Sequence, residues 1–147
     1  MISSPEKKDD PKLDAELDVY VSALLGRKAR NPVLLDVRPL TSIADAFLIC
    51  HGTSTRQVSA IAEHVQRALK KQGIKALSVE GLRDGHWVLM DYGHVLIHVF
   101  YESTRQFYDL EGLWADARRI RTPGMEKLIE DEGAPDDEDV GASFFID

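Results

Sequence analysis

The chain lacks several features that define whole classes of protein. Its 147 residues include a single Cys, so neither an internal disulfide nor a four-cysteine zinc site can form. No apolar run approaches the ~20 residues that a membrane-spanning helix needs. Residues 1–12 are polar and hold no apolar core of a signal peptide. These absences predict a cytoplasmic protein that does not cross a membrane.

Motifs for catalysis and metal binding are equally scarce. Cys50 lies within an apolar run, where a free Cys is usually a small hydrophobe, and the sequence has no Gly-x-Ser-x-Gly elbow and no P-loop. His94 and His98 share one face of an expected strand but lie ~13 Å apart, which is too far for one metal ion. His51 has no acidic partner at a suitable spacing. The sequence therefore predicts no catalytic residue, no metal site and no cofactor.

A basic block is missing as well, because the charges are divided unevenly along the chain. Residues 1–120 hold 16 basic and 16 acidic side chains, whereas residues 121–147 hold 2 basic and 9 acidic ones. A neutral body attracts a nucleic-acid backbone poorly, and an acidic tail is repelled by it. We therefore expect little direct nucleic-acid binding. The tail, which ends in an apolar triplet at 144–146, either aids solubility or steers the chain toward a basic partner.

The chain does have the alternation of strands and amphipathic helices that is typical of an α/β fold. Ser54 and Gln57 fit a capping box at the start of one of these helices. A strand, a helix and a strand over residues 46–79 predict a βαβ unit with parallel strands. Apolar spacing and turn residues predict helices over 11–29, 55–72 and from Asp109 onward, and strands over 33–37, 46–50, 76–79, 87–91 and 94–101.

These elements predict one α/β domain with a mixed sheet and flanking helices. The domain is expected to span residues 11–121, because Thr122-Pro123-Gly124 breaks the last helix. A flexible arm over 1–10 precedes it. An acidic tail over 122–147 follows it and contains a short helix near 125–131.

The segment 87–101 predicts a β-hairpin that turns at Tyr92-Gly93 and pairs Trp87 with His98. Side chains alternate between the two faces of a strand, so one face collects the core residues Val88, Met90, Val95, Ile97 and Val99. The opposite face mixes aromatic, apolar and titratable side chains: Trp87, Leu89, Asp91, His94, Leu96, His98 and Phe100. This mixture is typical of a protein-binding surface. The competing interpretation is that a helix covers this face and that His98 is a satisfied, half-buried residue.

The turn Gly52-Thr53-Ser54 precedes an expected helix and is suited to a phosphate group. A nucleotidyltransferase would follow such a turn with paired carboxylates that hold magnesium, but the residues that follow here, 55–58, include no acid. We therefore interpret the turn as a helix cap. The alternative function is a nucleotidyltransferase that uses this turn and takes its carboxylates from Asp36, Asp45 or Glu80.

Five motifs follow one another over about residues 14–118: SIADAFLIC at 42–50, GTSTRQV at 52–58, VEG at 79–81, WVLMDYGHVLIHVF at 87–100 and RQFYDLEGLW at 105–114. Their order resembles the ribosomal silencing factor (RsfS) family, also called Iojap-like proteins. The ordered set is far more specific than any one motif. The resemblance implies a nucleotidyltransferase-like α/β topology without catalytic acids.

The resemblance also implies a function and a binding surface. It implies binding to the large ribosomal subunit through large-subunit ribosomal protein fourteen, a steric block of subunit joining, and repression of translation when nutrients are scarce. Family members are also linked to large-subunit assembly, and some form homodimers when free. Six positions of the family pattern are carried over as partner-binding: Trp87, Asp91, His98, Arg105, Tyr108 and Trp114. The mixed hairpin face adds Leu89 and His94, although position 94 is often acidic in the family.

Overall fold

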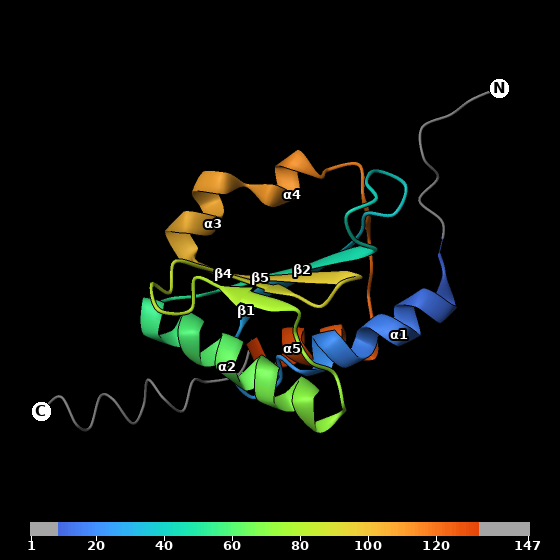
Figure 1. Cartoon of the computed structure of the whole chain (residues 1–147). Coiled ribbons are helices and arrows are strands. Elements are labelled where there is room, and N and C mark those ends of the chain that lie inside the picture. The colour runs from blue at the N-terminus through green and yellow to red at the C-terminus, as the bar shows by residue number, and fades with distance from the viewer. Residues whose placement is uncertain (1–8, 133–147) are drawn as a thin grey trace, which may run out of the picture.

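The computed structural model describes residues 9–132, which form three layers (Figure 1). The middle layer is a mixed sheet of β1 (Arg30–Asp36), β2 (Ala46–Gly52), β3 (Ser78–Glu80), β4 (Trp87–Asp91), β5 (Val95–Tyr101) and β6 (Arg118–Arg119). One face is covered by α1 (Pro11–Ser22), α2 (Thr55–Lys71) and α5 (Pro123–Glu132), and the other by α3 (Glu102–Tyr108) and α4 (Leu110–Leu113). The predicted fold class is confirmed.

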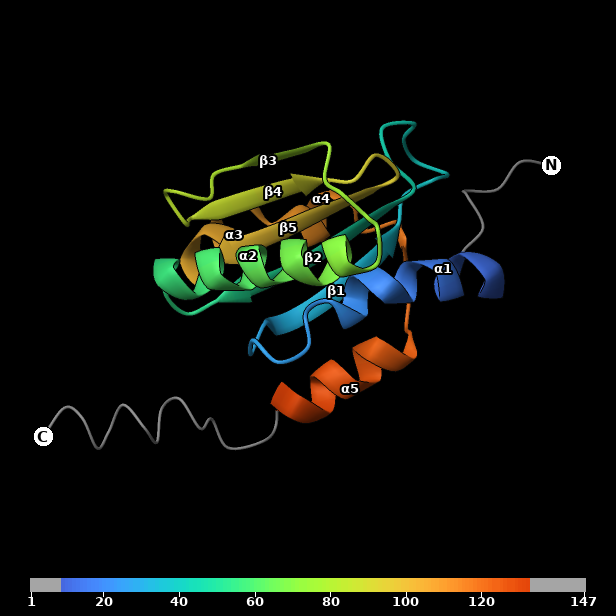
Figure 2. The same ribbon diagram turned by 60° about the horizontal axis from the view of Figure 1, so that its bottom comes forward.

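The strands follow the order β3-β4-β5-β2-β1-β6 across the sheet. Strands β2 and β5 are parallel, and the other neighbours are antiparallel. Strands β2 and β3 therefore run in the same direction, as the βαβ prediction requires, but β4 and β5 lie between them. Figure 2 shows α2 lying along the sheet between these two strands of the unit.

Local sequence signals fix the helix starts and ends. The Ser54 hydroxyl accepts the Gln57 N–H at 3.0 Å, which confirms the predicted cap, and the Asp10 carboxylate caps α1 in the same way by accepting the Leu13 N–H at 3.2 Å. The first helix ends at Ser22 rather than at 29. Gly26 and Lys28 adopt positive φ angles of 88° and 57°, which a right-handed helix does not allow, so turns replace its expected end.

The predicted hairpin is present, but its register differs by two residues. Trp87 pairs with Phe100 instead of His98. Because side chains alternate with a period of two, this shift leaves every strand residue on its predicted face. The core face is confirmed, since its members are fully buried: Val88, Met90, Val95, Ile97 and Val99.

The register differs because the turn is centred one residue later, on Gly93-His94. The Asp91 carboxylate accepts the Gly93 N–H at 2.8 Å, and the Tyr92 N–H donates to the Val95 carbonyl at 3.0 Å. Gly93 has a φ of 91°, a conformation that costs glycine little. The Asp91 side chain is therefore part of the turn.

The region after β5 differs most from the prediction. Instead of one helix from Asp109, two short helices meet at Asp109, which has a φ of 46° and accepts the Gly112 N–H at 3.2 Å. Arg118 and Arg119 then pair with β1 as strand β6. The following helix α5 belongs to the folded body, because Met125 is 2% and Leu128 3% exposed in the main core. The boundary expected after residue 121 therefore falls too early, because α5 packs in the core.

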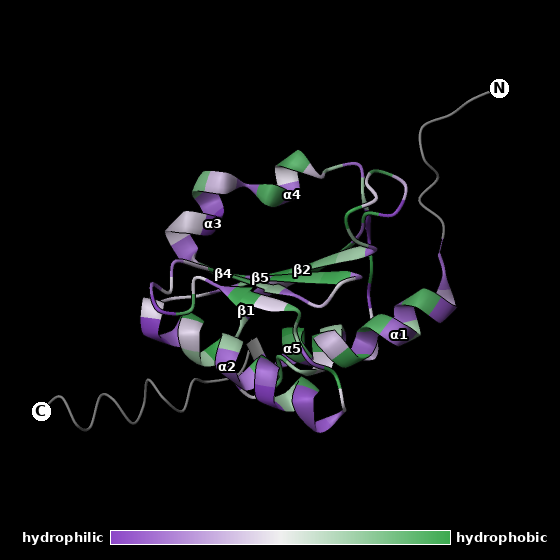
Figure 3. Ribbon diagram, viewed as in Figure 1, coloured by the Kyte–Doolittle hydropathy of each residue, from purple (hydrophilic) through white to green (hydrophobic). Residues whose placement is uncertain are grey.

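Two apolar clusters hold the layers together. The larger lies between the sheet and α1, α2 and α5, and the smaller joins the other sheet face to residues of the α3–α4 layer such as Leu110 and Trp114. Figure 3 shows predominantly hydrophobic strands between helices that carry hydrophilic residues. Among residues 9–132, no helix combines the length and apolar composition that a membrane crossing needs.

Candidate functional site

A series of aromatic rings leads from the surface of the α3–α4 layer into the sheet. Phe107 and Tyr108 are 80% and 50% exposed, and their ring centroids lie 5.0 Å apart. The Tyr108 ring lies 4.8 Å from that of half-buried Trp87, which lies 4.9 Å from that of buried Phe100. Such contacts stabilise the arrangement while leaving its outer end in water.

Leu113 on α4 adds a further apolar side chain that is 74% exposed. We call Trp87, Phe107, Tyr108 and Leu113 the outer patch. All four lie on β4, α3 and α4, on the sheet face opposite α1, α2 and α5 (Figure 1). Large apolar side chains held in water on short, fixed helices are characteristic of a protein-binding surface.

His98 lies directly beneath Trp87 and is only 5% exposed. The Trp87 indole N–H donates to His98 Nδ1 at 3.1 Å, so the proton of the neutral ring is on Nε2. Among residues 9–132, no group accepts a hydrogen bond from that Nε2. Burial lowers the pKa of His98 from its usual 6.5 to about 4. His98 is therefore a neutral residue that supports Trp87, and it is buried more deeply than the helix-covered interpretation expected.

We expect this histidine to make the fold sensitive to acid. Its pKa in the folded state lies below the unfolded value, so its stabilising effect is complete above pH ~6.5 and is lost as the pH falls toward 4. The expected loss of unfolding free energy is about 3 kcal/mol, from about 1.4 kcal/mol for each pKa unit. Urea denaturation at pH 7, 5.5 and 4 measures it.

His98→Gln should remove most of this pH dependence. His86→Gln is the matched control, because the His86 side chain is half exposed and pairs with Asp84 at 2.6 Å. His64→Gln tests a second histidine that contributes to the pH dependence of stability. The pKa of His64 is also lowered, mainly by burial and then by the nearby charge of Arg27. A His98→Gln variant with the pH dependence of the unmodified chain would show that His98 does not carry the effect.

Arg105 lies beneath the outer patch rather than in it. Its side chain is buried, with Nε donating to the Glu111 carboxylate at 2.6 Å and Nη1 lying 2.9 Å from His51 Nδ1. Nη1 also donates to the Arg30 carbonyl at 3.3 Å. These contacts connect α3 to α4, β1 and β2. Arg105 therefore positions the patch and does not itself reach a partner.

The other predicted residues divide into two groups. Leu89 pairs with His98 and Trp114 packs on Phe47 with ring centroids 5.1 Å apart, so both lie under or beside the patch. Asp91 is at the far end of β4, ~13 Å along the strand from Trp87. His94 lies on the sheet face covered by α1, α2 and α5, where its Nε2 is 3.2 Å from the hydroxyl of Tyr20 on α1. The expectation that His94 shares a face with Trp87 is therefore wrong, whereas Asp91 keeps its predicted face of β4.

Phe107 and Leu113 were not among the residues that the sequence singled out. Both lie within the quoted motif RQFYDLEGLW, where an aromatic pair stands beside polar residues in a short helix. An apolar side chain that breaks the polar face of a surface helix was the available signal. Whether such a side chain points to the sheet or to water could not be inferred, because one helix from Asp109 was expected instead of two short helices that meet there.

Two of the three carboxylates named for the alternative nucleotidyltransferase, Asp36 and Asp45, lie far from the turn at 52–54. Asp36 pairs with Ala46 at the start of β2, and Asp45 precedes that residue, whereas Gly52 ends the strand ~20 Å away. The Asp36 carboxylate accepts hydrogen bonds from Arg38 and Arg118. Within residues 9–132, no three His, Cys, Asp or Glu side chains form a cluster suited to a metal ion.

The fold is that of a small α/β protein whose α3–α4 layer exposes large apolar side chains. A family model described as "Ribosomal silencing factor during starvation" matches residues 10–143. The chain therefore belongs to the ribosomal silencing factor (RsfS) family.

Named relatives and solved structures agree with this assignment. The chain is 41% identical over 109 residues to ribosomal silencing factor RsfS of Halalkalibacterium halodurans, covering 74% of this chain and 93% of the relative. It is 31% identical over 102 residues to mouse "Mitochondrial assembly of ribosomal large subunit protein 1", covering 67% of this chain and 45% of that protein. A crystal structure from Chromobacterium violaceum matches with a TM-score of 0.65 and 34% identity, over 78% of this chain and 91% of the other.

Proposed function

We propose that the chain binds the large ribosomal subunit through large-subunit ribosomal protein fourteen, blocks joining of the small subunit sterically and so represses translation under nutrient limitation. Membership in the RsfS family supports a ribosomal partner. The observation that carries the proposal is the outer patch, in which Phe107 is 80% and Leu113 74% exposed and Trp87 packs against Tyr108. A partner that covers this patch removes apolar surface from water, which favours binding.

Two further roles belong to the same proposal. The printed name of the mouse relative concerns assembly of the ribosomal large subunit, which supports a role in large-subunit biogenesis. A second copy of the chain is another occupant of the outer patch, so we propose that the free protein forms a homodimer that dissociates on docking. Leu89, His98, Arg105 and Trp114 are proposed to support the patch from beneath or beside it.

Sucrose-gradient sedimentation of purified subunits tests the main proposal. At saturating concentration the protein should shift joined ribosomes to free subunits and should sediment with the large subunit. A variant with Phe107→Ala and Leu113→Ala, added at the same concentration, should leave more ribosomes joined. Undiminished joining in the presence of saturating unmodified protein would refute the proposal.

A further inference from the structure

A second surface lies on the sheet face covered by α1, α2 and α5, where the end of α2 approaches edge strand β3. Residues 64–79 contain four cations and neither Asp nor Glu. The cations are Arg67, Lys70, Lys71 and Lys75. The whole chain has a net charge of −7, and its first 120 residues are neutral on average. These averages conceal the local excess of positive charge over residues 64–79.

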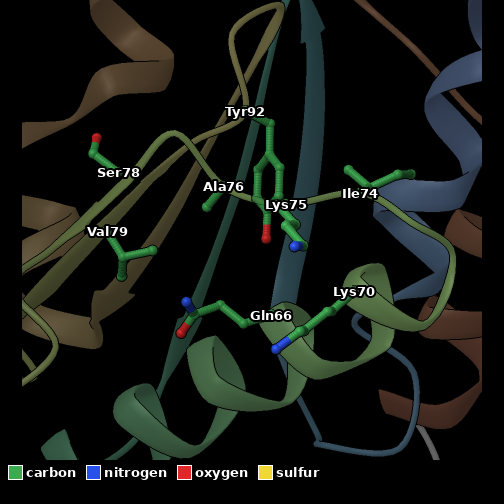
Figure 4. A pocket seen from close by; sticks show the side chains of 8 residues that line it. All are labelled: Gln66, Lys70, Ile74, Lys75, Ala76, Ser78, Val79 and Tyr92. Atoms are coloured by element: carbon green, nitrogen blue, oxygen red, sulfur yellow. The ribbon is translucent and has the colours of Figure 1, made fainter.

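A cavity of about 280 Å³ opens within this surface (Figure 4). Gln66 and Lys70 extend from α2, Lys75 comes from the segment between α2 and β3, and the Tyr92 hydroxyl points toward them from the opposite side. Ile74, Ala76, Ser78 and Val79 complete the lining. Lysine ammonium groups donate hydrogen bonds and accept none, so this set of groups favours an oxygen-rich anion.

No acidic side chain among residues 9–132 neutralises the four cations by an ion pair. Within residues 9–132, the ion pairs engage other cations, among them Arg38, Arg105 and Arg118, and none of these four. The nearest acids along the chain, Glu63 and Glu80, are exposed at the two ends of the basic stretch. The pKa of His64, lowered mainly by its burial, is lowered further by several positive charges that include Arg67 and Lys71.

We propose that this basic surface binds the phosphate backbone of RNA, with Lys70 and Lys75 holding one phosphate at the mouth of the cavity. The inference rests on the proposed function, because a large subunit offers RNA beside its proteins. Four cations spread beyond the cavity suit a polyanion, whereas a free mononucleotide would engage the two cavity lysines alone. The cavity is also smaller than the ~300–1,000 Å³ of typical small-molecule sites.

Fluorescence anisotropy with a labelled single-stranded RNA of ~20 nucleotides tests this directly, at 50 and 200 mM salt. The unmodified chain should bind with strong salt dependence. A variant with Lys70→Ala and Lys75→Ala should bind more weakly, and its salt slope should be smaller by about 0.7, the value for one phosphate contact on a single strand. A variant with Lys12→Ala and Lys127→Ala is the matched control, because both side chains are exposed on other elements.

Binding to intact large subunits separates this inference from the proposed function. The Lys70/Lys75 variant should show a smaller salt dependence there, whereas the Phe107/Leu113 variant should lose affinity equally at both salt concentrations. Absence of RNA binding by the unmodified chain, or equal binding by the Lys70/Lys75 variant, would overturn the inference. So would tight binding of adenosine monophosphate or inorganic phosphate that blocks RNA, because the ligand is then a small molecule. Failure to bind subunits, with RNA binding still dependent on these lysines, would refute the proposed function alone.

Discussion

A chain truncated after Gly124 should be largely unfolded, whereas a chain truncated after Glu132 should be as stable as the full-length protein. The first truncation removes Met125 and Leu128, which are 2% and 3% exposed in the main core. Loss of a buried side chain of this size costs about 2–5 kcal/mol, and a domain has about 5–15 kcal/mol of stability. It also removes the N–H of Met125, which donates to the Thr122 hydroxyl at 3.2 Å.

Urea denaturation followed by circular dichroism measures this difference. Two substitutions on α5 provide a matched pair: Leu128→Ala should cost about 3 kcal/mol, and Ile129→Ala, at a side chain 40% exposed, less than about 1 kcal/mol. If the chain ending at Gly124 unfolds at the urea concentration of the full-length protein, α5 does not belong to the cooperative unit and the original boundary stands.

Replacing Phe107 and Leu113 together by Ala should weaken binding to the large subunit by about 2–4 kcal/mol, or about 30- to 1,000-fold. Both side chains lie mostly in water in the free protein, so the unfolding free energy should change by less than about 1 kcal/mol. A large loss of affinity without a loss of stability is the expected signature of a docking residue. Trp87→Ala should also weaken binding by about 2 kcal/mol.

Trp87→Ala alone does not separate docking from folding, because Trp87 also contacts Phe100 and His98. The substitutions at Phe107 and Leu113 separate docking from folding, because both side chains are mostly exposed. Ile43→Ala is the control, since Ile43 is 62% exposed but lies in the loop between β1 and β2. Binding of labelled variants to purified large subunits gives the affinities. Equal affinity for the double variant and the Ile43 control would show that the outer patch is not the docking surface.

The sequence predicted the elements whose signals are local. Ser54 caps α2 because its hydroxyl needs only the N–H of Gln57, three residues away. The hairpin faces were predicted because a strand alternates its side chains whatever the register. The turn lies one residue later than predicted because the Asp91 carboxylate accepts the Gly93 N–H. The sequence of this turn is compatible with several turn geometries, so it did not select this one.

The site depended on contacts between segments far apart in sequence. Arg105 is buried because His51 and Glu111 meet it from β2 and α4, and neither contact follows from spacing along the chain. The helix α5 was assigned to the tail because Thr122-Pro123-Gly124 was expected to end the folded domain, yet Met125 and Leu128, one turn apart, pack in the core. His94 was expected on the same hairpin face as Trp87, but the turn is centred one residue later and His94 lies near Tyr20.

Both tryptophans of the chain lie on the same side of the sheet. Trp87 touches Tyr108 and Trp114 touches Phe47, both within or beneath the layer that carries the outer patch. Indole emission changes when water leaves the ring, so intrinsic fluorescence reports occupancy of this one face. The cavity between Lys70 and Tyr92 is lined by α2 and by residues 74–79, and neither Trp87 nor Trp114 is among its lining residues. The chain therefore carries a native optical label that distinguishes an occupied patch from an occupied cavity without any chemical modification.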